Sequence, residues 1–474
     1  MSGRWILFAA ASLATGCILG PDYERPEVPL PEGWRGLNAE ETVSLADVPW
    51  WELFEDPVLE ELIRTALAEN KDLEIAIERI EEARAMYGFT RADLYPKVDA
   101  RAGAGVLELS GNDVGVAPGE DLDGERYAVA GTVFWELDVF GRIRRTSEAQ
   151  QAIFFATQEA RRAVVVALVA DVAQAYMELR DFDRRLDIAR RTLEARREYV
   201  VLARDRFEGG KTSEIDWRQA EAEYHRVAST VSQLEALVTQ TENHLSVLLG
   251  RNPGSIPRGM PVDTMPVPLA VPSGLPSELL DRRPDVRYAE ELLVSANAGI
   301  GAAKALLYPS ISLTGSFGWV SQDLDELLQS SSQSWLIGAD LLQPIFNAGQ
   351  NRRRVEMAES QQRQALYEYE HFILRAFREV EDALVGHRKA GEQRDSQGLR
   401  VAAERQVLML AELRYRGGVA SYLEVLDAQR SMFTAELDEA QAIRDQLVSL
   451  VLLYKALGGG WSEAQPAEPE ERQP

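Results

Sequence analysis

Cysteine is almost absent from this chain of 474 residues, because Cys17 is the only one. A single cysteine excludes an internal disulfide. Histidine is scarce as well, and the four histidines lie far apart without the spacing of metal ligands: His225, His244, His371 and His387. None of the HExxH, GxSxG or phosphate-binding-loop patterns occurs. The sequence therefore gives an enzyme little support, and we expect no catalytic activity, metal site or cofactor.

Basic residues are in deficit. Lysine and arginine total 51 against 76 aspartates and glutamates, which gives a formal net charge of −25. A protein of this charge is repelled by phosphate backbones, and the sequence contains no basic patch interleaved with aromatic residues. Both observations argue against nucleic acid as a partner.

Long hydrophobic runs are also lacking, and the apolar run near the N-terminus, Trp5 to Ala14, is too short for a membrane span of about twenty residues. Arg4 precedes it, and Leu13-Ala14-Thr15-Gly16-Cys17 follows. This pattern predicts a secretory signal over residues 1–16 that ends in a bacterial lipobox. We expect acylation of Cys17 and attachment to a membrane. Ile18 follows, where lipoproteins of the inner membrane commonly carry aspartate, so the outer membrane is favoured.

Proline is unevenly distributed. Residues 17–56 are rich in it, which forbids helix and predicts an extended tether. No proline occurs between Pro118 and Pro253, or between Pro344 and Pro466, and both stretches are rich in helix-forming residues. We therefore predict long helices. One from about Arg142 to Phe207 would span close to 100 Å at ~1.5 Å per residue, which exceeds a compact domain.

The chain contains a repeat. The segment Arg206-Phe207-Glu208-Gly209-Gly210-Lys211-Thr212-Ser213 returns as Arg414-Tyr415-Arg416-Gly417-Gly418-Val419-Ala420-Ser421. Tyr95-Pro96 likewise returns as Tyr308-Pro309. We predict two copies of one unit, residues 57–255 and 276–460. A proline-rich linker, 256–275, joins them, and residues 461–474 form an acidic tail that we expect to be disordered.

Each copy has the same predicted elements. Apolar residues recurring at three and four predict one helix from Pro57 to about Thr90. Alternating residues then predict paired strands, over 98–106 and 127–137 in the first copy and 311–319 and 335–341 in the second. A long helical hairpin follows, reversed at a Gly-Gly pair. An apolar spacing near 3.5 between Leu426 and Tyr454 predicts a coiled-coil seam.

Four strands of membrane-spanning length cannot close a barrel alone. An open edge in lipid costs several kcal/mol for each unpaired backbone group. Closure therefore requires several chains, and three would supply about twelve strands. The predicted fold is α+β, mostly α: a β-barrel with four strands per protomer that several chains close, continuous with an α-helical barrel of coiled-coil hairpins.

These features resemble the TolC-like outer-membrane efflux proteins, in particular the lipid-anchored branch that serves RND multidrug pumps. The resemblance extends over nearly all of the mature chain. The segments that carry it are Cys17-Ile18-Leu19-Gly20-Pro21-Asp22-Tyr23, Trp50-Trp51, Trp135-Glu136-Leu137-Asp138-Val139-Phe140-Gly141-Arg142, Leu280-Asp281-Arg282-Arg283-Pro284-Asp285-Val286, and Arg414 to Arg430. The resemblance implies a homotrimer whose strands form one outer-membrane β-barrel and whose helices form a periplasmic α-helical barrel. Such a trimer would passively conduct drugs or other small molecules from a periplasmic adaptor and an inner-membrane RND transporter to the exterior.

Candidate functional residues gather near the Gly-Gly turns. Glu424 and Asp427 are three residues apart and share a helix face. The resemblance implies that they form an acidic periplasmic constriction, although glutamate replaces the family's usual residue at the first position. It further implies adaptor contacts at the turns Gly209, Gly210, Gly417 and Gly418, and a polar link between Asp216 and Tyr415. Plain helix reversals, a solvated acidic face and an exposed pair that never meets are the structural alternatives.

Two other functions fit part of the sequence. A duct of a type I protein-secretion system would share the fold, and a lipid-anchored coiled-coil scaffold would need only the long helices. The lipobox favours RND efflux over the first, and the alternating strands argue against the second. Among the tryptophans, Trp135, Trp319 and Trp335 fall in predicted strands, as in an aromatic girdle, whereas burial is expected for Trp50 and Trp51.

Overall fold

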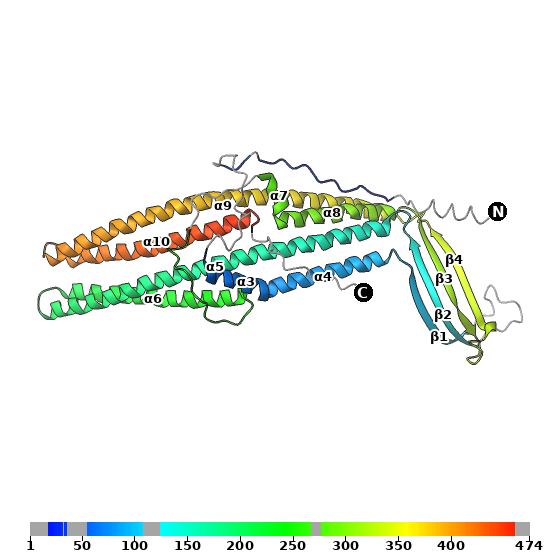
Figure 1. Ribbon diagram of the computed structural model, residues 1–474, viewed down its shortest axis with the longest axis horizontal. Coiled ribbons are helices and arrows are strands. Elements are labelled where there is room, and N and C mark those ends of the chain that lie inside the picture. Colours follow the sequence, from blue (N-terminus) through cyan, green and yellow to red (C-terminus); the bar gives the residue numbers. More distant parts are fainter. Residues whose placement is uncertain (1–17, 32, 36–54, 108–123, 267–275, 460–474) are drawn as a thin grey trace. The chain divides into compact units, whose positions relative to one another are not determined.

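The computed structural model describes residues 18–31, 33–35, 55–107, 124–266 and 276–459. These residues divide into two compact units. The sheet unit comprises the described residues of Met1–Glu27, Arg79–Gln158 and Tyr288–Glu370, and the hairpin unit comprises those of Val28–Glu78, Glu159–Arg287 and His371–Pro474. Helix dominates and is accompanied by one small antiparallel sheet (Figure 1), which confirms the predicted mixture of elements.

The sheet contains four antiparallel strands in the order β1-β2-β3-β4. The strands are β1 (Lys97–Leu107), β2 (Gly124–Leu137), β3 (Ser310–Ser321) and β4 (Gln333–Leu342). Each predicted strand is present, and its ends lie at most three residues beyond the predicted ones. The central pair β2 and β3 joins the two predicted copies, with Val129 opposite Trp319. Within the described sheet, β1 and β4 each have a neighbour on one side only.

The junction between β2 and α5 (Arg142–Glu208) explains one of the quoted sequence segments. The Asp138 carboxylate accepts hydrogen bonds from the backbone N–H groups of Ile143 at 2.9 Å and Arg144 at 2.8 Å. These are free donors of the first helical turn, so the aspartate stabilises the helix start. The Trp135 indole donates to the Leu94 carbonyl at 3.0 Å, which joins β2 to the end of the preceding helix.

The prediction of a single helix from Pro57 to about Thr90 is wrong. The structure has α3 (Pro57–Glu69) and α4 (Lys71–Ala92), separated at Asn70. Asn70 has an extended backbone (φ −66°, ψ 129°) and its side chain accepts a hydrogen bond from the Leu73 N–H at 3.0 Å. Its amide also donates to the Leu248 carbonyl, 178 residues away, at 2.9 Å. A distant partner therefore sets the break.

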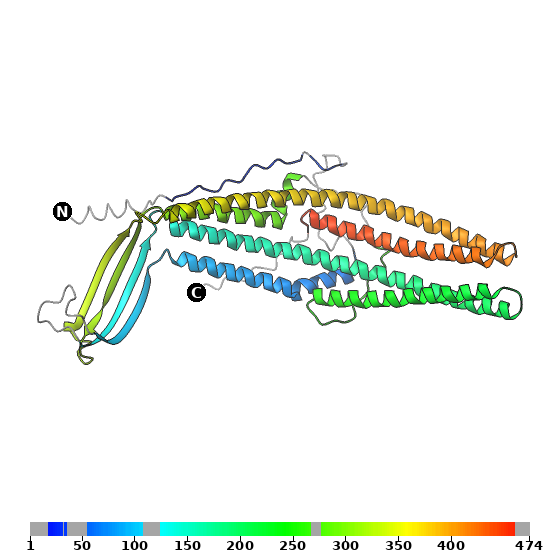
Figure 2. The same ribbon diagram turned by 180° about the vertical axis from the view of Figure 1, so that it is seen from behind.

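The hairpin unit contains most of the long helices, which Figures 1 and 2 show as two hairpins. One hairpin joins α5 to α6 (Glu214–Leu248), and the other joins α9 (Gln350–Arg416) to α10 (Tyr422–Ala456). Shorter elements of this unit include α7 (Leu279–Arg282) and the 3-10 turn at Pro276–Glu278. Most of α8 (Pro284–Ala305) and the 3-10 turn at Ser330–Ser332 belong to the sheet unit. None of the described helices has both the length and the apolar character needed to cross a bilayer.

The predicted coiled-coil seam of α10 is confirmed. Six of its seven members are buried and Leu437 is partly buried. The buried members are Leu426, Phe433, Ala440, Leu447, Val451 and Tyr454. Phe433 and Ala440 pack in one cluster with Leu186 of α5 and with Val227 and Leu234 of α6. Burial of such side chains contributes about 1.5 to 3 kcal/mol each for the larger ones, so this cluster holds α10 against the first hairpin.

Candidate functional site at the glycine turns

The first helical hairpin reverses at Gly209 and Gly210. The Gly209 N–H donates to the Asp205 carbonyl at 2.9 Å, and the Lys211 N–H donates to the Arg206 carbonyl at 2.8 Å. Gly210 has φ +69°, a conformation that side chains rarely adopt. Gly210 therefore permits the turn in which the N–H groups of Gly209 and Lys211 satisfy the last carbonyls of α5.

The second hairpin reverses in the same way. Gly417 donates to the Leu413 carbonyl at 3.0 Å, Val419 donates to the Arg414 carbonyl at 3.1 Å, and Gly418 has φ +73°. The donor and acceptor of each bond lie 208 positions after the corresponding donor and acceptor in the first turn. The helix reversals predicted from the Gly-Gly pairs are confirmed, whereas adaptor contact at these four glycines stays a prediction.

The acidic pair lies in the first turns of α10. Glu424 and Asp427 are both exposed, while Val425, Leu426 and Ala428 between and beside them are buried. The Glu424 carboxylate lies 3.5 Å from the Arg414 guanidinium across the turn. The helix therefore presents the two carboxylates on its solvent face, as their spacing predicted. Their role as a constriction stays a prediction.

A buried polar network lies one turn further along α10, and sequence reasoning missed it. Gln429 accepts a hydrogen bond from Arg196 of α5, whose side chain is buried. Arg430 donates to Glu223 of α6 at 2.8 Å. Glu223 is 1% exposed although it is charged. The helix that carries the acidic pair is thus held by polar side chains of both helices of the first hairpin.

Tyr415 and Asp216 differ in their surroundings. The Tyr415 hydroxyl accepts a hydrogen bond from Arg206 at 2.6 Å, and Asp216 is half-buried. The link between Tyr415 and Asp216 stays a prediction. Nearby, Tyr199 of α5 donates to Glu412 of α9 at 3.0 Å. Burial and this carboxylate raise the pKa of Tyr199 to about 12, so its hydroxyl stays protonated and donates between the two hairpins at neutral pH.

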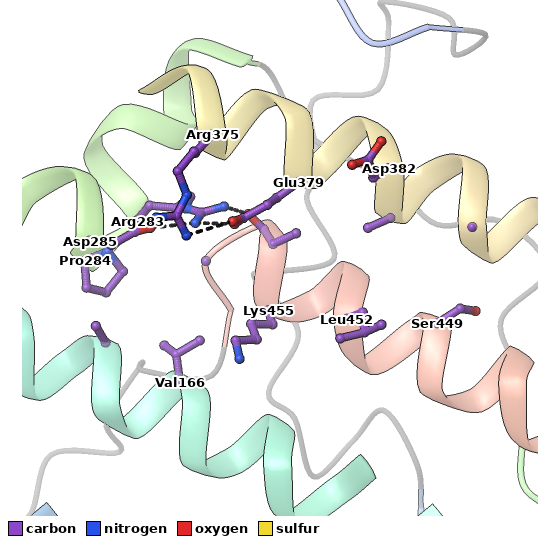
Figure 3. Close-up of a pocket in the computed structure, with 15 residues that line it drawn as sticks. Val166, Arg283, Pro284, Asp285, Arg375, Glu379, Asp382, Ser449, Leu452 and Lys455 are labelled. Atoms are coloured by element: carbon purple, nitrogen blue, oxygen red, sulfur yellow. Dashed lines mark hydrogen bonds and ion pairs between the residues drawn. The ribbon is translucent and has the colours of Figure 1, made fainter. Parts of the chain in front are cut away.

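A cavity of about 570 Å³ lies elsewhere in the hairpin unit, between α5, α9, α10 and the start of α8 (Figure 3). Arg283 lies on its wall and contacts Asp285 at 2.6 Å, Glu379 of α9 at 2.7 Å and the Ala456 carbonyl of α10 at 3.2 Å. The contacts of this buried arginine give a structural role to Arg283 and Asp285, which belong to the segment Leu280 to Val286 quoted for the family resemblance. Arg283 joins the start of α8 to α9 and α10, and its guanidinium donates to groups of the protein itself.

The remaining sequence candidates lie outside the described residues. These are Cys17, the predicted acylation site, together with Trp50 and Trp51. The described part of the chain contains no group of acidic, cysteine and histidine side chains suited to hold a metal ion.

Comparison with known proteins supports a membrane channel. The family model of outer membrane efflux proteins matches residues 62–251 and 275–459. The solvent efflux pump outer membrane protein SrpC of Pseudomonas putida is 38% identical over 466 residues, covering 97% of this chain and 98% of that protein. The cation efflux system protein CusC of Escherichia coli is 35% identical over 461 residues, covering 96% of this chain and 98% of that protein.

The fold is also that of a solved channel. The crystal structure of the open state of the Neisseria gonorrhoeae MtrE outer membrane channel superimposes with a TM-score of 0.84 at 32% identity, over 94% of this chain and 99% of that one. The sheet, the long hairpins and these similarities define an outer-membrane efflux channel that works with other pump components. The chain belongs to the outer membrane efflux protein family.

Proposed function

We propose that the protein is the exit duct of a tripartite RND-type efflux system, assembled as a homotrimer. The observation that carries this proposal is the four-stranded sheet, in which β1 and β4 each lack a second neighbour among the described residues. An unpaired strand edge is not tolerated in lipid, so three copies joined edge to edge would form one closed barrel of about twelve strands. The helical hairpins would then form the periplasmic tunnel.

The proposal includes the partners and the anchor. A periplasmic adaptor would contact the glycine turns, and an inner-membrane RND transporter would supply the energy. Acyl chains on Cys17 would attach the chain to the outer membrane. The duct itself would be passive and would catalyse nothing. The relatives named above belong to a solvent efflux pump and a cation efflux system, which supports efflux over protein secretion. Their different cargoes suggest that the pump selects the drug or other small molecule.

Within the duct, we assign Glu424 and Asp427 to the constriction. Threefold symmetry would place three copies of each exposed carboxylate around the axis. A ring of acids concentrates cations and repels anions, and the effect weakens as salt screens the charges. The Tyr415 and Asp216 link would hold neighbouring hairpins together at the same level.

Planar-bilayer recording of the purified trimer tests the proposal. We expect cation-selective conductance that increases in Asp427→Ala, because three negative charges and three side chains leave the narrowest ring. Asp187→Ala is the matched control, since Asp187 is an exposed acid of α5 that pairs with Arg191 at 3.2 Å. Absence of conductance in verified trimers of both forms would contradict the channel. Equal conductance and selectivity in wild type and Asp427→Ala would contradict the constriction alone.

A further inference from the structure

The cavity of about 570 Å³ in the hairpin unit has the kind of wall that binds small molecules (Figure 3). Pockets for drug-sized ligands are mostly apolar and carry a few fixed polar groups. Four helices supply the apolar part of this wall: Ala163, Val166, Pro284, Ala383, Leu452 and Ala456. Leu452 is 45% exposed and belongs to the wall. Apolar surface is therefore open to a ligand.

Most charged groups of the wall are already paired within the chain. The Arg283 guanidinium donates to Asp285 at 2.6 Å and to Glu379 at 2.7 Å. Arg375 lies 3.4 Å from Glu379 as well. These two cations and two anions balance each other. Asp382 is 75% exposed and its carboxylate points away from the cavity in Figure 3.

Lys455 of α10 carries a charge that remains available. Its ion pair among the described residues is with Asp171 of α5 at 4.0 Å, and its ammonium makes no hydrogen bond to the described part of the chain. Figure 3 shows its side chain extending from α10 toward Val166 of α5. Charges interact more strongly beside a low-dielectric protein surface than in bulk water. This ammonium is therefore suited to hold an anion.

A glycine keeps the cavity accessible. Gly386 lies inside α9, is exposed and lines the cavity. Glycine inside a helix is destabilising relative to alanine, and close approach of another part of the chain is a usual reason to retain it. That reason does not apply here, since a Cβ added to Gly386 would have no atom of the chain within 4 Å outside its own helical turn. The missing side chain instead leaves this side of the cavity open.

We propose that this cavity binds an organic acid with an apolar body, whose carboxylate pairs with Lys455 while the body lies against Val166, Ala383 and Leu452. Charge complementarity selects the anion, because the other cations of the wall have close carboxylates and Lys455 does not. The site goes beyond the proposed exit duct and does not depend on it, since one chain forms the described wall. Single-chain acids from the membrane and aromatic acids among exported compounds share this chemistry.

Isothermal titration calorimetry of the full-length protein in amphipol tests the site with decanoate and with 2-naphthoate. We expect saturable binding to wild type, and binding weaker by about tenfold or more in Lys455→Gln, because the charge-assisted bond to the carboxylate is lost. Lys455→Arg should restore binding, and the neutral amides of both acids should not distinguish wild type from Lys455→Gln. Lys389→Gln is the matched control, since Lys389 of α9 is exposed and pairs with Glu392 at 2.7 Å. Tighter binding of decanoate would indicate a membrane-derived acid, and tighter binding of 2-naphthoate an exported aromatic compound.

Gly386→Leu tests the cavity without changing a charge. Leucine favours helix and has room at this position, so the variant should fold and lose affinity for both acids by about tenfold or more as the side chain fills the opening. Gly88→Leu in α4 is the matched control, because a Cβ there also has no atom within 4 Å. Absence of binding to wild type, or equal affinity in wild type, Lys455→Gln and Gly386→Leu, would overturn the site. A lower trimer yield in Gly386→Leu with no acid bound by wild type would likewise overturn it and assign the cavity to a contact between copies.

Discussion

Glu223 joins α6 to α10 through a buried carboxylate between two arginines. It accepts from the Arg226 Nε at 3.0 Å and from the Arg430 Nε at 2.8 Å. Burial alone would raise the pKa of Glu223, but the hydrogen bonds and charges of the two arginines outweigh burial and lower it. The folded protein therefore favours the ionised carboxylate. Arg430 lies one turn beyond Asp427 on α10. Through Arg430, Glu223 therefore holds the helix that presents the acidic pair.

Removal of the Glu223 carboxylate should destabilise the hairpin unit. We expect Glu223→Ala to lower the free energy of unfolding by about 3 kcal/mol, because it leaves Arg430 and Arg226 without their buried partner. Chemical denaturation in detergent measures this. Glu221→Ala is the matched control on the same helix, since Glu221 pairs with Arg218 at the surface, and it should cost less than about 1 kcal/mol. Equal losses in both variants would contradict the role of Glu223.

The same comparison at low pH checks the cause. A carboxylate whose pKa is lower in the folded state contributes stability above its unfolded pKa, and this contribution disappears as the pH falls through the folded pKa. The stability difference between wild type and Glu223→Ala should therefore be full at neutral pH and decrease once the pH falls below the ordinary pKa of 4.5. A difference that grows on acidification would contradict the charge-based explanation.

At the scale of elements, Asn70 separates α3 from α4 and uses both ends of its amide. We expect Asn70→Ala to cost about 2 kcal/mol, since it removes an N-cap and leaves the Leu248 carbonyl without its donor. Asn70→Asp is the matched variant, because it keeps the cap to Leu73 but loses the donor to Leu248. It should fall between wild type and Asn70→Ala in thermal unfolding. Indistinguishable midpoints for all three proteins would show that packing alone sets the break.

Local chemistry made most elements predictable from sequence. Proline-free stretches bounded the long helices, alternation located the strands, and the Gly-Gly pairs located both turns. The break at Asn70 was not predictable, because no proline or glycine marks it and its partner lies 178 residues away. The buried Arg145 of α5 could not be distinguished from the adjacent arginines, since its partners include the carbonyls of Leu19 and Gly20, more than 120 residues away. The shared exposed face of Glu424 and Asp427 was predictable because it depends only on their spacing of three residues along one helix.

At the scale of the whole molecule, the sheet has two chemically different faces. Ile311, Leu313 and Phe317 of β3 alternate with Ser312, Thr314 and Ser316. In β4, Trp335, Ile337 and Leu341 lie on one face and are 66 to 80% exposed. Two strand pairs continue this pattern, with Leu313 opposite Ala339 and Ser312 opposite Asp340. The polar face of β4 also carries Leu336 and Leu342, which stand opposite Ser316 and Ser310. A closed barrel in a bilayer needs such a division, with apolar residues toward lipid and polar residues toward the lumen.

Lysine substitutions on the two faces of β4 should therefore have unequal effects on assembly. Ile337→Lys would place a charge toward lipid, where it costs about 2 to 4 kcal/mol at the bilayer midplane and less near the interface. Ser334→Lys, on the opposite face of the same strand, would place the charge toward the water-filled lumen. We expect Ile337→Lys to reduce the fraction of heat-modifiable trimer in outer membranes and Ser334→Lys to leave it nearly unchanged. The reverse order would mean that the polar face contacts lipid, and equal yields would contradict insertion of this sheet into a bilayer. In the proposed trimer every copy would contribute the same strand and the substitution would occur three times, so even a penalty at the low end of this range should be measurable.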